Sequence, residues 1–318
     1  MLGGAVSLAL LAGSSSHTPA IAHESTSRKI VLILQSEDEA AFDETVSGLS
    51  QHFQKVHSDK AVRIEVRNLA RLVSPESELK AELEALKPAL LITLGSQATL
   101  WAQSSVRDVP LLFGMVLDPL AQGIEPAHAS SPMTGVSMQI PFSEQFERLR
   151  QVLPGARRVG TVFDARNQAL IDEARREAGR QGLTLVGAPV ANPAEVPEAF
   201  RTLVGKVDAL WSFPDTTVYS REAAQFILLF SFRNRLPLMG FSRGYVRAGA
   251  LFALYADYRD LGRQLAGVAH EIIGGRSPRD IPMAAPRRHA LAINLRVAEA
   301  LGTSVPAGVR AQAEELFK

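Results

Sequence analysis

Short apolar runs of strand length alternate with helical patterns along this chain. In the first series, the runs expected to form strands are residues 29–34, 62–66, 89–94 and 110–116. Helical patterns separate them, and residues 41–56, for example, place their apolar side chains on one face. Strands that are this apolar and are joined by helices are typical of a parallel sheet covered on both faces. The first series therefore predicts an α/β layer structure.

A second series follows in the same order. Its expected strands are residues 158–163, 183–187, 207–212 and 236–241, with helices at 168–181, 195–204 and 220–235. Two halves of matching order indicate two similar lobes, whereas the alternative is a single doubly wound domain. A chain of 318 residues is long enough for two lobes. We predict an α/β fold of two similar parallel-sheet lobes with a ligand cleft between them.

The chain that follows the second series is too short for a third domain. We therefore expect it to complete the two lobes and to cross between them. We assign residues 28–138 to lobe 1, completed by residues 249–276. We assign residues 139–248 to lobe 2, completed by residues 277–318.

The first 22 residues have the pattern of a secretory signal peptide. An apolar run at residues 5–12 is followed by serines and then by Ala20-Ile21-Ala22, an A-x-A cleavage pattern. The run is shorter than the roughly 20 apolar residues that a membrane-spanning helix needs. We expect a mature protein that is exported, periplasmic and soluble; a leader without function is the alternative interpretation.

The sequence contains no cysteine, which excludes disulfides, thiolate metal sites, cysteine nucleophiles and a lipid anchor on cysteine. Its 34 Lys and Arg residues nearly balance 33 Asp and Glu residues, so the net charge does not favour nucleic-acid binding. The sequence also lacks the glycine-rich nucleotide motifs and the H-E-x-x-H metal motif. We therefore expect no cofactor, no metal and no nucleic-acid partner.

Residues 240–244 match G-x-S-x-G, the nucleophile motif of α/β-hydrolases, with Ser242 as the nucleophile. Residues 245–254 read as a short turn and a strand, not as the long helix which that fold requires. The chain after Ser242 is also too short for the rest of a hydrolase. A secreted serine hydrolase that uses Ser242 is the alternative from a different functional class.

In parallel α/β sheets, ligands bind beyond the carboxyl ends of the strands. The segments at these ends mix hydroxyl, amide, charged and aromatic side chains. They are 35–37, 95–97, 118, 163–166, 213–216 and 241–243, which include Gln35, Ser36 and Arg243. Two lobes that face each other with such loops would enclose a small polar or zwitterionic molecule with a flat apolar part.

Two of these residues have competing interpretations. Ser96 follows Gly95 and opens a helix, so it either helps to bind a carboxylate or simply caps that helix. Asp215 either holds an ammonium group or caps the helix that follows it.

We expect Trp101, Trp211 and Phe232 to lie in the core, since each falls within a helix or strand and not in a loop.

Seven blocks of the sequence, over roughly residues 28 to 306, carry a family resemblance. They are KIVLILQ at 29–35, LITLGSQA at 91–98, PLLFGMVLDPLAQGI at 110–124, MTGVS at 133–137, VDALWSFPDTTVYS at 207–220, GALFALYADYRDLGRQ at 249–264 and IIGGRSPRDIP at 272–282. In this order, the blocks resemble the ABC-transporter substrate-binding proteins, and most of all the branch that handles tryptophan and related aromatic amino acids. The resemblance implies a type I periplasmic binding fold, in which three crossing strands join two lobes.

The resemblance also implies ligand-binding positions. They are Ser96, Gln97, Ser137, Asp164, Asp215, Thr216 and Ser242. The chain departs from the usual family residues at Met138, Asp164-Ala165, Asp215-Thr216 and Arg243. Since the departures remove acidic groups and add an arginine, we expect the cleft to be shifted towards anionic ligands.

These observations predict a ligand-binding receptor and not an enzyme. We expect Ser96 and Gln97 to bind the ligand's carboxylate and Asp215 to bind an amine. Phe163, Tyr219 or Phe241 would contact the flat part of the ligand. The expected partners are the ligand and the permease subunits of an ABC importer in the inner membrane, and the receptor is expected to be a monomer. A periplasmic ligand sensor for a sensor kinase or another membrane protein is the alternative within binding proteins.

Overall fold

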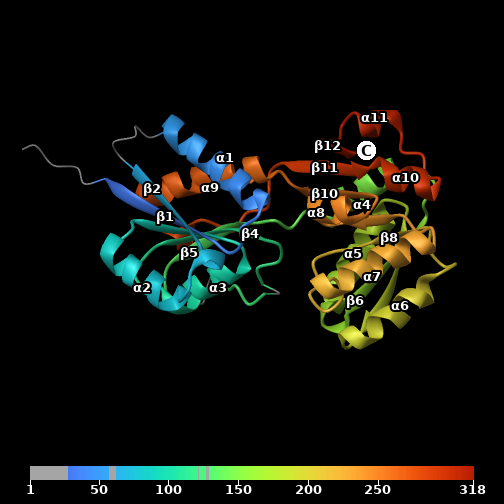
Figure 1. Ribbon diagram of the computed structural model, residues 1–318, viewed down its shortest axis with the longest axis horizontal. Helices are drawn as coiled ribbons and strands as arrows, with labels where there is room; N and C mark the ends of the chain where they lie inside the picture. Colours follow the sequence, from blue (N-terminus) through green and yellow to red (C-terminus); the bar gives the residue numbers. More distant parts are fainter. Residues whose placement is uncertain (1–27, 57–61, 121, 127–128) are drawn as a thin grey trace, which may run out of the picture.

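The computed structural model describes residues 28–56, 62–120, 122–126 and 129–318. The expected signal peptide lies outside these residues. Within them, one parallel sheet and one mixed sheet form two lobes side by side (Figure 1). The fold class predicted from the sequence is confirmed. Of the helices described, none is long and apolar enough to cross a membrane.

The first lobe is built on a five-stranded parallel sheet with the strand order β2-β1-β3-β4-β5. Its strands are β1 (Lys29–Gln35), β2 (Val62–Asn68), β3 (Leu90–Leu94), β4 (Leu111–Val116) and β5 (Met133–Ser137). The helices that cover it are α1 (Ala40–Val56), α2 (Pro75–Leu86), α3 (Ser96–Ser105) and, from far along the chain, α9 (Tyr258–Ile273). A 3₁₀ turn, η1 (Leu69–Arg71), follows β2.

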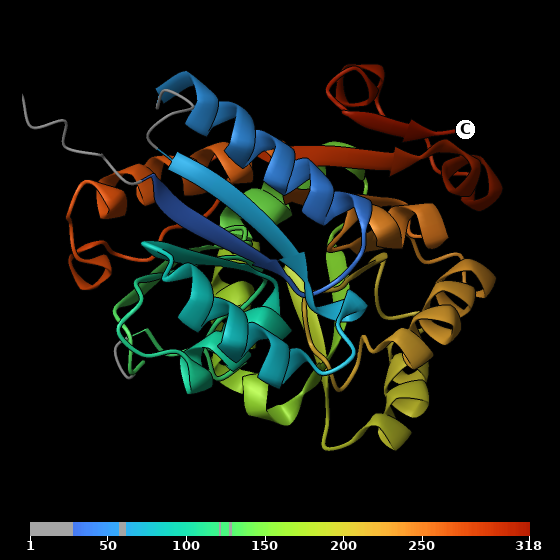
Figure 2. The same cartoon turned by 60° about the vertical axis from the view of Figure 1, so that its left-hand side comes forward.

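Strand β1 shows why both faces of this sheet need helices. Val31 and Ile33 belong to the buried cluster shared with α1 and α9, whereas Leu32 and Leu34 belong to the cluster shared with α2 and α3. Successive side chains of a strand point to opposite faces, so an uninterrupted apolar run buries both. In Figures 1 and 2, α1 and α9 lie side by side on one face of the sheet, opposite α2 and α3.

Helices α1 and α9 approach each other closely at two glycines. A Cβ atom on Gly262 would lie 2.0 Å from the backbone oxygen of Thr45, and one on Gly48 would lie 2.1 Å from that of Arg259. Any side chain at these positions would therefore push the two helices apart. The glycines hold α9 against the first lobe, although α9 follows the second lobe in sequence.

The second lobe is built on a seven-stranded sheet with the order β12-β11-β10-β9-β8-β6-β7. Its strands are β6 (Arg158–Asp164), β7 (Thr184–Val190), β8 (Ala209–Trp211), β9 (Leu238–Gly240), β10 (Phe252–Ala256), β11 (His289–Asn294) and β12 (Glu315–Phe317). All pairs are parallel except β10 with β11. The helices are α4 (Phe142–Val152), α5 (Gln168–Arg180), α6 (Val196–Leu203), α7 (Arg221–Arg233), α8 (Arg243–Ala248), α10 (Leu295–Leu301) and α11 (Ala307–Arg310), with 3₁₀ turns η2 (Ala165–Asn167), η3 (Pro193–Glu195) and η4 (Pro278–Asp280).

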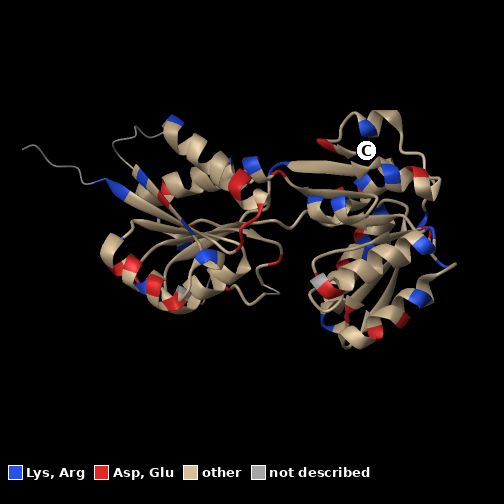
Figure 3. Cartoon of the chain, in the orientation of Figure 1, with Lys and Arg blue, Asp and Glu red and all other residues tan. Residues whose placement is uncertain are grey.

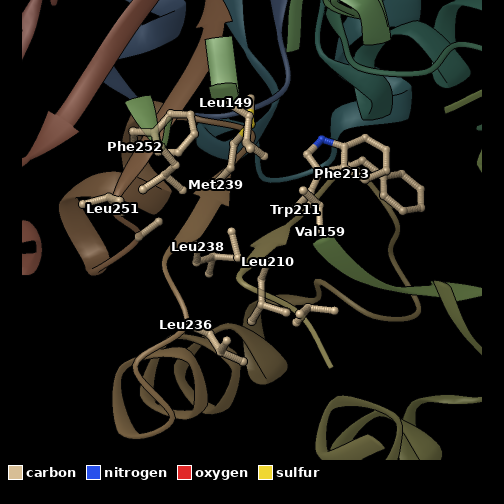
Figure 4. Close-up of a cluster of buried hydrophobic side chains, with 14 of the residues drawn as sticks. Leu149, Val159, Leu210, Trp211, Phe213, Leu236, Leu238, Met239, Leu251 and Phe252 are labelled. Carbon is tan, nitrogen blue, oxygen red and sulfur yellow. The ribbon is translucent and has the colours of Figure 1, made fainter. Parts of the chain in front are cut away.

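Trp211 is fully buried in the core of the second lobe (Figure 4). Its indole stacks on Phe213 at 5.1 Å between ring centroids and donates a hydrogen bond from Nε1 to Gln145 Oε1 at 2.8 Å. The core position expected for Trp211 is confirmed, and Trp101 is half-buried. The expectation for Phe232 is wrong, since this side chain is 48% exposed.

The reason for the exposure of Phe232 lies in the helical periodicity of α7. Phe226 and Phe230, four residues apart on one face of the helix, pack against Phe200 at centroid distances of 6.4 and 5.5 Å. Phe232 is two positions from Phe230 and so lies on another face of the helix. Membership of an apolar helix alone therefore does not place a side chain in the core.

The chain after residue 249 is divided differently from our expectation. β10, which we assigned to the first lobe, pairs with β9 and β11 in the second lobe's sheet. Conversely, Ala284 bridges Val136 at the end of β5, so the start of the segment assigned to lobe 2 lies against lobe 1. Within residues 129–318, all of which the structure describes, the chain crosses between the lobes three times: between β5 and α4, between β10 and α9, and between η4 and β11.

Candidate functional site

A cavity of about 480 Å³ lies between the two lobes. Leu117, Asp118 and Gln122 line it from the loop that follows β4 in the first lobe. The loops at the carboxyl ends of β6, β8 and β9 line it from the second lobe. Their lining residues are Asp164, Arg166, Asn167, Pro214, Asp215, Thr216, Thr217, Tyr219 and Phe241. Both lobes therefore supply side chains at the strand ends where ligands bind in α/β proteins.

Asp215 ties two of these loops together. Its Oδ1 accepts hydrogen bonds from the backbone N–H groups of Thr217 (3.0 Å) and Val218 (3.2 Å). Its Oδ2 accepts hydrogen bonds from the backbone N–H of Asp164 (2.7 Å) and from Nδ2 of Asn167 (2.9 Å). The carboxylate is buried at the cavity wall and so fixes the loop after β8 to the loop after β6.

The alternative role for Asp215, as a cap of the following helix, is wrong. Ser220 is the N-cap of α7, and its Oγ accepts a hydrogen bond from the N–H of Ala223 at 3.2 Å. Asp215 lies five residues before that cap and makes a turn of its own. The position of Asp215 in the cavity wall leaves a ligand-binding role open to it.

Asp164 and Arg166 form a charge pair on the same wall. Arg166 Nε donates to Oδ1 of Asp164 at 2.9 Å and Nη2 donates to Oδ2 at 2.5 Å. Thr217 Oγ1 also donates to Asp164 Oδ2 at 2.6 Å. The hydrogen bond from the Arg166 guanidinium, together with that from Thr217, holds the pKa of Asp164 well below its usual range. Asp164 therefore stays ionised at physiological pH.

An apolar hollow adjoins this polar cavity. Leu117, Asp118, Pro214 and Phe241 line both, so the two spaces are continuous along the cleft. The further lining of the hollow is mainly apolar and comprises Met138, Gln139, Ile140, Phe142, Gln145, Leu170, Phe213 and Leu254. The ring of Phe241 packs against Tyr219 and Tyr245 at centroid distances of 6.1 and 5.1 Å. The cleft thus combines a charged end with an aromatic and aliphatic end.

Comparison with known proteins identifies the kind of protein that carries this cleft. The family model described as ABC transporter substrate binding protein matches residues 30–317. The chain belongs to this family. A curated relative, a tyrosine-binding protein of Clostridioides difficile (strain R20291), is 21% identical, and the match covers 95% of this chain and 90% of the relative.

Solved structures of substrate-binding proteins share the fold. The ligand-free, open structure of a substrate-binding protein with adhesive properties from Clostridium difficile has a TM-score of 0.73 at 21% identity, covering 91% of this chain and 99% of that one. A domain in complex with L-Trp from Streptococcus pneumoniae has a TM-score of 0.67 at 21% identity, covering 92% of this chain and 100% of that one. This substrate-binding protein therefore has the two-lobed architecture of its structural neighbours.

The substrate-binding protein places only part of the predicted site in the main cavity. Of the residues expected from the sequence, Asp164, Asp215 and Thr216 line it. Ser96 does not line the cavity itself, but its Oγ contacts Oε1 of the lining residue Gln122. Phe163 is buried in the core of the second lobe, whereas Tyr219 and Phe241 do line the cavity. Asp118 and Arg166 also line the cavity; they lie in the strand-end segments named from the sequence but were not among the expected binding residues, whereas Gln122 was in neither set.

The remaining predicted residues of the first lobe do not line the main cavity. Ser36 Oγ accepts a hydrogen bond from the N–H of Ala98 at 3.0 Å and so satisfies the first turn of α3. Ser96 is not the cap of this helix, because Gly95 occupies the N-cap position. Gln97 faces another hollow of the first lobe together with Ser36 and Trp101. Gln35 and Ser137 are buried at the ends of β1 and β5.

Arg243 lies outside the main cavity. Its Nη2 is 2.9 Å from Glu44 Oε1 on the first lobe, and its Nε is 3.6 Å from Glu315 Oε2 on the second. Its guanidinium also lies over the ring of Tyr258, 5.6 Å from the centroid. The charge that we expected to shift the cleft towards anions is therefore paired across the two lobes. Both acidic and basic residues are found on the outer helices of each lobe (Figure 3).

Replacing Arg243 by alanine should accordingly leave the charge preference of the cleft unchanged. We expect the affinities for a zwitterionic ligand and for an anionic one to change by the same factor, less than about fivefold, since the lost ion pair is partly exposed. Calorimetric titration of the two compounds measures this. A loss confined to the anion would place Arg243 in the ligand site after all.

The geometry around Ser242 differs from that of a catalytic serine. Its Oγ accepts a hydrogen bond from the N–H of Tyr245 at 3.2 Å and caps α8, a helix of six residues where we expected a turn. His289, a histidine that follows Ser242 in the sequence as the histidine of an α/β-hydrolase triad would, has its Nδ1 2.6 Å from Glu144 Oε2. In the described part of the chain, Ser242 therefore contacts the backbone of α8 and His289 contacts Glu144, and no hydrogen bond joins the two residues.

Proposed function

We propose that this substrate-binding protein is exported, binds an aromatic amino acid or a related small carboxylate between its lobes, and delivers it to the permease subunits of an ABC importer. The observation that carries the proposal is the junction of a charged cavity with an apolar hollow in one cleft. An amino acid with a large ring has the same two parts. The relatives that bind tyrosine and L-Trp support this ligand class.

The charges of the cavity favour a ligand with an ammonium group. Asp118, Asp164 and Asp215 line it against one cation, Arg166. An excess of carboxylates attracts a positive group, so within the proposed class it favours an amino acid over a carboxylate that lacks the ammonium group. Asp215 remains the proposed partner for the amine, because it lies in the wall of the cavity beside Tyr219.

The ring of the ligand would lie against Phe241. This side chain lines both the charged cavity and the apolar hollow, and Tyr219 packs edge-on against it. Burying an aromatic side chain against such rings removes apolar surface from water and adds a favourable ring–ring contact. Ligand binding would then bias the hinge towards a closed form that the permease recognises.

A thermal-shift screen tests the proposal. The protein without residues 1–22 is refolded to remove bound ligand and is mixed with amino acids, small carboxylates, nucleosides and purines. A ligand at 100 times its Kd should stabilise the fold by about 2.7 kcal/mol, which raises Tm by several degrees. We expect the shift with aromatic amino acids or close carboxylate analogues. A shift confined to nucleosides or purines, or no shift at all, would contradict the proposed ligand class.

A further inference from the structure

Arg166 combines high exposure with a fixed position. Its side chain is 83% exposed, whereas that of its partner Asp164 is 4% exposed. Long surface side chains usually lose rotamer entropy when they bind, which weakens their contribution. Here, a buried carboxylate already holds the guanidinium in place before any ligand arrives.

The hydrogen bonds of Arg166 leave one side of the guanidinium free. Nε and Nη2 are directed to Asp164, and Nη2 also donates to Thr217 Oγ1 at 3.3 Å. Among the contacts of the described residues, Nη1 makes no hydrogen bond, although Arg166 lines the cavity. Guanidinium groups bind carboxylates through such N–H donors in a fixed plane.

Asp164 is itself prevented from moving. Its Oδ1 also accepts the backbone N–H of Arg166 at 2.9 Å, and its Oδ2 accepts the hydroxyl of Thr217 at 2.6 Å. Its own backbone N–H is bound to Asp215. The position of Arg166 is therefore determined by the same network that joins the loops after β6 and β8.

We propose that Arg166 binds the carboxylate of the ligand through Nη1, so that the second lobe and not Ser96 and Gln97 of the first lobe holds this group. The inference rests on the proposed function, since it requires a ligand with a carboxylate. Arg166 is the one cationic side chain among the described residues that line the main cavity. Ser96 is engaged with Gln122, and Gln97 faces a different hollow.

The test pairs each ligand with its decarboxylated amine. L-tryptophan is compared with tryptamine, and L-tyrosine with tyramine, in calorimetric titrations of the wild type and Arg166→Gln. A hydrogen bond to a charged group accounts for about 10- to 100-fold in affinity. We expect Arg166→Gln to lower the affinity for the amino acid by this factor and to change the affinity for the amine by less than about threefold.

Three further variants separate the alternatives. The double variant Asp164→Asn/Arg166→Gln leaves no buried charge unpaired. If it still loses affinity for the amino acid and not for the amine, the missing guanidinium is the cause. Arg201→Gln, on α6 and paired with Glu198, removes an arginine of the second lobe outside the cavity and should change neither affinity. Ser96→Ala tests the first-lobe assignment and is expected to have little effect.

Two results would overturn the inference in distinguishable ways. If Arg166→Gln changes the affinities for the amino acid and for the amine by the same factor, Arg166 does not bind the carboxylate. The same conclusion follows if only Ser96→Ala lowers the affinity for the amino acid and not that for the amine. In both cases the proposed function stands. If the wild type binds no aromatic amino acid or carboxylate, the proposed function fails and this inference fails with it.

Discussion

Replacing Gly262 by alanine is expected to lower the free energy of unfolding by about 3 kcal/mol, the upper part of the usual range for overpacking. The added Cβ would lie 2.0 Å from the backbone oxygen of Thr45 and 2.8 Å from the backbone N of Leu49. Backbone atoms inside a helix cannot rotate away as a flexible side chain can. Helix α9 would have to move off α1 and lose part of the buried contact of Leu261 and Leu265 with the first lobe.

Gly267 on the same helix provides the matched control. A Cβ there meets nothing within 4 Å, and alanine is the better helix former by about 0.5–1 kcal/mol. Gly267→Ala should therefore be neutral or slightly stabilising. Thermal and urea unfolding of both variants measures the difference. Equal stability of Gly262→Ala and Gly267→Ala would mean that α1 and α9 do not pack through their backbones.

Replacing Asp215 by alanine is expected to weaken ligand binding by about 100-fold or more. The carboxylate accepts four hydrogen bonds, two of them from Asp164 and Asn167 in the other loop of the cavity wall. Hydrogen bonds to charged groups contribute about 1.5–3 kcal/mol each, and 1.4 kcal/mol corresponds to a tenfold change in affinity. The variant loses the ammonium partner proposed for the ligand and also the alignment of the wall that carries Arg166.

Asp172→Ala is the control for this variant. Asp172 lies on α5 of the same lobe and is about half exposed. Its ion pair with Arg175 lies at the surface of that helix. We expect its ligand affinity to stay within about twofold of the wild type. Titrations with the ligand found in the screen, after circular dichroism has verified folding, compare the two variants. An Asp215→Ala protein with unchanged affinity would show that this wall of the cavity does not bind the ligand.

Hydrophobic periodicity was enough to predict two parallel-sheet lobes, because strands buried on both faces leave uninterrupted apolar runs such as residues 29–34. The same signal could not assign β10 to a lobe. Its apolar run is suited to either sheet, and only its pairing with β9 and β11 decides between them. The close contact of α9 with α1 depends on single glycines, whose role is visible only once the two helices are placed together.

The candidate site was predictable where it depends on strand ends. Asp164 is the last residue of β6 and Asp215 lies in the loop after β8, and the carboxyl ends of parallel strands meet at one edge. Arg166 stands two residues after Asp164, and an acid–arginine pair so close to a strand end is a signal that was available. Arg243 also follows a strand, but it faces Glu44 across the lobes. The direction of a side chain in a loop depends on its partners, which the order of residues does not reveal.

The most direct test of the account is the distance between the lobes with and without ligand. The chain contains no cysteine, so two can be introduced and spin-labelled without interference. Leu120, which is 64% exposed on the cavity loop of the first lobe, and Ala169, exposed at the start of α5, provide the two positions.

Electron–electron distance measurements should show a shorter distance when the aromatic ligand saturates the protein, and no change when Asp215→Ala is exposed to the same ligand concentration. Binding by the wild type with an unchanged distance would contradict a ligand site that draws the two lobes together.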